Sequence, residues 1–73
     1  MNEMELARRA MIGIRNEAVR SQHKLRQELA TPNIHPETAM VLKTAIKTYD
    51  ALIQQYDKEI DNLGRLLEKE NND

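Results

Sequence analysis

The fold of this chain is decided by residues 39–67, which read AMVLKTAIKTYDALIQQYDKEIDNLGRLL. Apolar side chains recur there at alternating three- and four-residue spacing through four heptads. One row consists of Ala39, Ile46, Ile53, Ile60 and Leu67, and an interleaved row consists of Leu42, Tyr49, Tyr56 and Leu63. A third row of Ala45, Leu52 and Leu66 is interrupted by Glu59 and widens the apolar surface. The pattern predicts a long helix that must pack against the rest of the chain, against another chain, or against both.

We expect nine of these residues to form the core or dimer seam: Leu42, Ile46, Tyr49, Leu52, Ile53, Tyr56, Ile60, Leu63 and Leu67. The two tyrosines fit two interpretations, because tyrosine is enriched in binding hot spots and also lies at the edges of helical cores. We favour the core for both.

Length and composition indicate one small helical domain. The chain has 73 residues, no Phe or Trp, two Tyr, and only two Gly and two Pro. The core must therefore consist of Leu, Ile, Met and Ala, which suit helix packing. The absence of cysteine excludes disulfides and thiolate metal sites and is compatible with a cytoplasmic location. We expect no secretory signal and no membrane span, and a net charge of −1 favours neither nucleic acid nor lipid.

The segment ATPNIHPE, residues 30–37, separates two helices. Pro32 disfavours helix at the residue before it, and Pro36 suits the first turn of a new helix. His35 is then the residue at the N-cap position. We expect one domain over residues 1–73, with helices at about 2–30 and 36–70, a loop at 31–35 and a polar tail at 71–73.

Charge differs between the two halves of the chain. Residues 1–35 hold six basic and four acidic side chains, whereas residues 36–73 hold five basic and eight acidic ones. Opposite net charges and a short connection favour antiparallel helices. We expect an all-α antiparallel two-helix hairpin. Two helices leave the third row uncovered, so we also expect a homodimer that forms a four-helix bundle, with a hetero-complex of the same geometry as the alternative.

The pattern of the first helix is less strict. Its apolar rows are Met4, Met11, Ala18 and Leu25, and Ala7, Ile14, Ser21 and Glu28. Small residues in the middle of this surface would let another helix approach closely, and we interpret Gly13 as a point of such contact.

Arg8, Arg15 and Arg26 lie on one stripe of the first helix, with Gln22 beside them. Arginine binds phosphates and acidic helices through its fork of donors, so the stripe fits an acidic partner. The interpretation that we favour is an exposed flank that pairs with acids of the second helix, namely Asp50, Asp57 and Asp61. For a protein partner we predict contacts with Met4, Arg8, Met11, Arg15 and Arg26, because methionine adds an adaptable apolar surface.

Metal, cofactor and catalytic sites are not expected. The two histidines, His23 and His35, lie on different segments without the spacing of metal ligands. Neither has a nucleophile or an acid as a partner close in the sequence.

The stretch DALIQQY, residues 50–56, resembles the second helix of the small sporulation-associated aspartyl-phosphate phosphatases of the stage-zero E type. Their motif reads Ser-Gln-x-Leu-Asp-x-Leu-Ile, and the match covers Asp50, Leu52 and Ile53. Serine, glutamine and the first leucine are replaced by Ile46, Lys47 and Tyr49. The resemblance implies a helical hairpin that dephosphorylates a response regulator, with Asp50 as the residue on which that activity depends.

A second resemblance covers the layout of most of residues 18–60. The run LRQEL at 25–29, a polar loop and a long second helix are similar to the small co-chaperones of type III secretion needle subunits. This resemblance implies a hairpin that joins another helical chaperone to hold an export subunit.

The function that we expect from the sequence is non-enzymatic. It is that of a small cytoplasmic adaptor, chaperone-like or regulatory protein of bacterial or phage type, which contacts a protein partner helix to helix. The alternative is the aspartyl-phosphate phosphatase.

Overall fold

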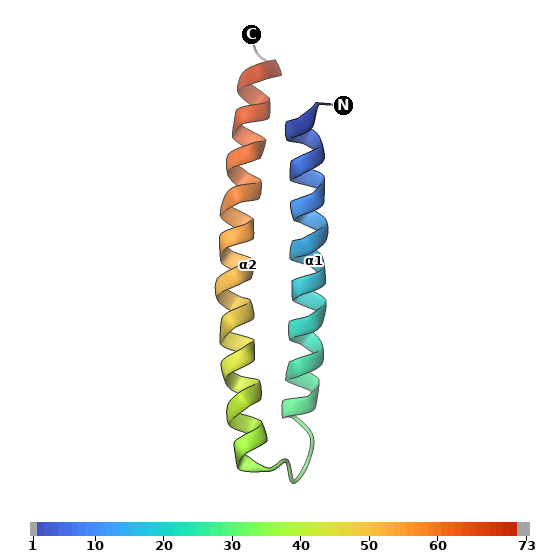
Figure 1. Cartoon of the computed structure of the whole chain (residues 1–73), viewed down its shortest axis with the longest axis vertical. Helices are drawn as coiled ribbons and strands as arrows, with labels where there is room; N and C mark the ends of the chain where they lie inside the picture. Colours follow the sequence, from blue (N-terminus) through green and yellow to red (C-terminus); the bar gives the residue numbers. More distant parts are fainter. Residues whose placement is uncertain (1, 72–73) are drawn as a thin grey trace.

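The chain forms two long antiparallel helices joined by a tight loop (Figure 1). The structure is a computed structural model, and it describes residues 2–71. Helix α1 spans Glu3–Leu29 and helix α2 spans Pro36–Asn71. These bounds differ by one residue or less from those expected at each end, and the described part of the chain contains no strand. The hairpin measures 59 × 17 × 13 Å. The start of α1 and the end of α2 lie side by side, at the opposite end of the hairpin from the loop (Figure 1).

Helix α1 begins at a side-chain cap and continues without a break. The Oδ1 atom of Asn2 accepts a hydrogen bond from the backbone N–H of Glu5 at 2.8 Å, which satisfies one of the free donors of the first turn. The acidic side chains of Glu3 and Glu5 favour the same end of the helix dipole. Gly13 does not interrupt the helix. It is exposed, and an added Cβ would have no atom within 4 Å, so the contact expected at Gly13 is absent from the hairpin.

The loop ends one helix and starts the next with few residues. At the end of α1, the N–H of Ala30 donates to the carbonyl of Arg26 at 3.1 Å. Asn33 has a φ of 62°, in the left-handed region that asparagine tolerates better than most residues. The Nδ1 atom of His35 accepts from the N–H of Glu37 at 3.2 Å. His35 is therefore the N-cap of α2, as its position before Pro36 predicts.

The interface between the helices is narrow. Its buried apolar residues are Ala18, Leu42 and Ile60, each 8 or 9% exposed, and no side chain of the described residues is fully buried. A pair of helices has only one line of contact, so most side chains of this seam stay partly open to water. The hairpin therefore has a seam and lacks an enclosed core.

Asn33 provides a test of the loop geometry. Asn33→Ala should lower the free energy of unfolding by about 1 kcal/mol, because a Cβ is strained at this φ without the local hydrogen bonding of asparagine. Asn33→Gly should be neutral or slightly stabilising. Urea unfolding followed by circular dichroism at one fixed protein concentration checks both variants. Equal stability of the two variants would show that residue 33 does not need the left-handed conformation.

Candidate functional site

Two arginines of α1 reach across to α2. Arg8 donates through Nε to the carbonyl oxygen of Ile60 at 3.2 Å. Its guanidinium lies over Gly64, where an added Cβ would come within 3.4 Å of Nε. Seven residues later, Arg15 Nε forms an ion pair with Asp57 Oδ1 at 2.9 Å. Both cations are therefore used inside the hairpin, and the lack of a side chain at Gly64 leaves room for the first of them.

Gln22 lies seven residues after Arg15, in the same row of α1 as Arg8 and Arg15. It is buried, at 5% exposed. Its Nε2 donates to the carbonyl oxygen of Ile46 at 2.9 Å and to Asp50 Oδ1 at 2.6 Å. Arg26, one turn further along α1, lies 3.6 Å from the same oxygen of Asp50. A buried amide is costly unless its hydrogen bonds are made, so these contacts favour one alignment of α1 on α2.

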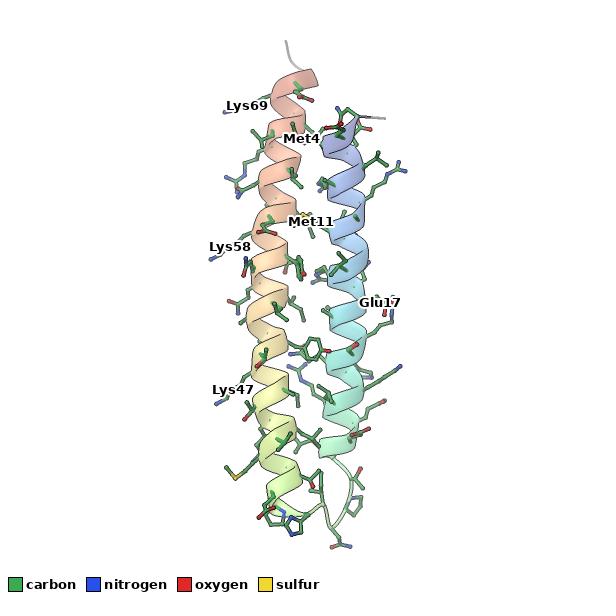
Figure 2. The ribbon with its side chains drawn as sticks, in the orientation of Figure 1. Met4, Met11, Glu17, Lys47, Lys58 and Lys69 are labelled. Carbon is green, nitrogen blue, oxygen red and sulfur yellow. The ribbon has the colours of Figure 1, made fainter. Side chains whose placement is uncertain are left out.

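The residues predicted to bind a partner lie along the contact between the helices. Met4, Arg8, Met11 and Arg15 are half-buried, and Arg26 is exposed. Figure 2 shows Met4 and Met11 in the space between α1 and α2. The expected ion pairs with Asp50 and Asp57 are confirmed, whereas Arg8 contacts a carbonyl oxygen and not Asp61. A role of these five residues in partner binding stays a prediction.

One of the two rows expected on α1 does not face α2. That row is Ala7, Ile14, Ser21 and Glu28, and Ile14 is 50% exposed. The two rows of α1 that do face α2 are Met4, Met11, Ala18 and Leu25, and Arg8, Arg15, Gln22 and Leu29. The two candidate rows flank the methionine row on opposite sides. The contacts that arginine and glutamine make with acids and carbonyls of α2 select the more polar row.

Most of the expected seam of α2 faces α1. Leu42 and Ile60 are buried. The half-buried members are Ile46, Tyr49, Ile53, Tyr56, Leu63 and Leu67. Leu52 is 41% exposed and lies outside the contact between the two helices.

Helix geometry places the uncovered apolar rows of α1 and α2 on the same side of the hairpin. On α2, the row of Leu52 and the row of Asp50 and Asp57 flank opposite edges of the seam. On α1, the row of Ile14 likewise lies on the edge away from the arginines. The ion pairs bring the arginine and aspartate edges together on one side, so the two apolar edges meet on the other. We call this side the apolar face; its residues are Ala7, Ile14, Ser21, Glu28, Val41, Ala45, Thr48, Leu52, Glu59 and Leu66.

The apolar face is exposed and hollowed along α2. Val41 is 68% exposed, Leu66 48%, and Met40, at its border, 69%. Three open hollows follow one another along the helix. The first is lined by Met40, Val41, Thr44 and Ala45, the second by Ala45, Thr48, Tyr49 and Leu52, and the third by Met11, Glu59, Asn62 and Leu63. The first two share Ala45 and so form one groove near the loop.

Two threonines in this groove have their hydroxyl groups bound to the helix backbone. Thr44 Oγ1 donates to the carbonyl oxygen of Met40 at 3.1 Å, and Thr48 Oγ1 donates to that of Thr44 at 3.1 Å. A threonine hydroxyl that bonds four residues back no longer offers its hydrogen to a partner. The groove is therefore less polar than its sequence indicates.

The exposed area of the chain is larger than its mass predicts. The hairpin exposes 5785 Å² of surface. A compact monomer of 8.5 kDa would expose about 4,700 Å², so the excess is about 1,100 Å². The excess follows from the elongated shape of the hairpin and is spread over all of its sides.

The described residues contain no group of three or more His, Cys, Asp or Glu side chains that could hold a metal ion. His35 is used as a helix cap, and Asp50 accepts a hydrogen bond from Gln22 beside Arg26. The phosphatase role implied for Asp50 stays a prediction. Neither helix has, within its described residues, an apolar stretch long enough to cross a bilayer.

The chain matches no protein-family model, and comparisons with curated proteins and with solved structures find no similar protein. Both family resemblances of the sequence are without support from these comparisons.

Gln22 provides a test of the polar contacts in the seam. Gln22→Glu should lower the free energy of unfolding by about 1–3 kcal/mol at pH 7, because the new carboxylate cannot donate to Ile46 or Asp50. The deficit should shrink below about pH 4, where the introduced carboxyl is protonated and can donate again. Gln27→Glu adds the same charge at an exposed position of α1 and is the control. Urea unfolding at both pH values is the measurement, and equal effects of the two substitutions would contradict the assigned role of Gln22.

Proposed function

We propose that this chain is a small non-enzymatic interaction protein that acts through helix–helix contacts with a protein partner. The apolar face is the contact surface, and the exposure of its large apolar side chains, Ile14, Val41, Leu52 and Leu66, is the observation that supports the proposal. A helix laid into a hydrophobic groove is a common mode of peptide recognition, read through side chains at three- and four-residue spacing. The face offers side chains at this spacing, from Val41 through Ala45, Thr48 and Leu52.

We place the contact on the apolar face and not on the arginine stripe, because the stripe is engaged within the hairpin. Arg15 is paired with Asp57, and Arg8 is bound to a carbonyl oxygen of α2. A partner that used these cations would have to break those contacts first. Leu52 and Leu66 need no such rearrangement.

Self-association into a four-helix bundle is part of the proposal. Both helices contribute to the apolar face, so two hairpins stacked face to face would bury side chains of all four helices. A cytoplasmic location completes the proposal, since a chain without cysteine suits a reducing compartment.

Leu52 is the residue that tests the contact surface. Leu52→Glu should weaken self-association at least tenfold, because it places a second carboxylate in the middle of the face. Gln54→Glu adds one negative charge at an exposed position two residues away and should leave association unchanged. Sedimentation velocity over a range of concentrations measures both. A Leu52 variant that associates as the unchanged chain does would remove the apolar face from the contact.

A further inference from the structure

Two charged side chains lie on the apolar face: Glu28 at its loop end and Glu59 near its middle. Glu59 lies seven residues after Leu52 and seven before Leu66, in the row that would face a docked helix. It is half-buried and lines the third hollow with Met11, Asn62 and Leu63. The carboxylate of Glu59 therefore interrupts an otherwise uncharged stretch in the middle of the face.

Among residues 2–71, no cation forms an ion pair with this carboxylate. The ion pairs among the described residues join arginines to Glu17, Asp50 and Asp57, and none includes Glu59. The two that cross between the helices lie on the opposite side. A helix that covered the face without a cation would remove water from an unpaired charge, which is strongly unfavourable. The occupant therefore has to bring a positive charge to Glu59.

A second copy of the chain is poorly suited to supply that charge. The residues of the apolar face include no lysine or arginine. Figure 2 shows Lys47, Lys58 and Lys69 on the outer side of α2, directed away from α1. Of these, Lys69 continues the row of Val41 and Thr48, but it lies ten residues beyond Glu59, near the end of α2. The residues of the chain's own face would meet Glu59 with apolar, neutral or acidic side chains, so self-association through them leaves the carboxylate uncompensated.

We infer that the apolar face fits an amphipathic helix of another protein that carries a lysine or arginine opposite Glu59. Aliphatic side chains on either side of that basic residue would contact Leu52 and Leu66. The inference rests on the proposed function and gives its partner a defined chemistry. Self-association is then the weaker state, which such a helix displaces.

Two synthetic helical peptides of about four heptads test this inference. Both have leucines along one face and differ only in their central residue, which is lysine in one and glutamate in the other. Fluorescence anisotropy with the full chain should give about tenfold tighter binding of the lysine peptide. Glu59→Gln should remove this preference, and Glu59→Lys should reverse it. Glu68→Lys makes the same charge change at an exposed position and should keep the preference of the unchanged chain.

The outcomes separate the inference from the proposed function. Equal binding of both peptides by the unchanged chain, or a lysine preference that survives Glu59→Gln, would overturn the role of Glu59 and leave helix binding intact. Binding of neither peptide would overturn both. Circular dichroism of each variant checks that the helices are retained. If Glu59→Lys does not fold, Glu59→Gln, which introduces no positive charge, still tests the inference.

Discussion

The alignment of the two helices depends on one row of polar side chains. Arg8, Arg15 and Gln22 follow one another at seven-residue spacing, and each makes a hydrogen bond or ion pair to α2. Aliphatic side chains alone allow a helix to slide or rotate on its neighbour, whereas a polar side chain that needs a defined partner favours one register. These contacts determine which edges of α1 and α2 lie side by side, and so they also determine where the apolar face is.

The same polar row explains why the hairpin exposes so much apolar surface. Three of the eight seam positions of α1 are occupied by arginine or glutamine, so fewer aliphatic side chains of α1 are available to cover α2. Ile14, which the simpler pattern places in the seam, lies outside it and is half exposed. Most small domains are stabilised by an enclosed core, whereas the described residues of this hairpin include no fully buried side chain.

The two helices could be predicted from local signals. The heptads of residues 39–67 predict the long helix, Pro36 and His35 mark its start, and the small number of Gly and Pro residues predicts helix elsewhere.

The row of α1 that faces α2 was harder to predict, because the rows of Ile14 and of Arg15 are equally close to the methionine row. The choice between them depends on side chains far away in the sequence, at Ile46, Asp50 and Asp57. One signal in the sequence favours the row of Arg15. Arg8, Arg15 and Gln22 are spaced by seven residues, and so are Asp50 and Asp57, so the two sets can face each other along the helices. Glu59 could be recognised as an interruption of its row, but the side of the hairpin it occupies follows only from those contacts.

The proposed function requires the apolar face of this hairpin to be covered by another chain. The most direct test is the thermal unfolding of the unchanged protein, followed by circular dichroism at concentrations from about 1 µM to about 1 mM. If hairpins stabilise one another through the apolar face, the midpoint temperature and the helicity at 37 °C should both rise with concentration. A sharp, highly helical transition at the same temperature across the whole range, together with a monomeric mass by light scattering, would show that the hairpin is stable alone and would contradict the account.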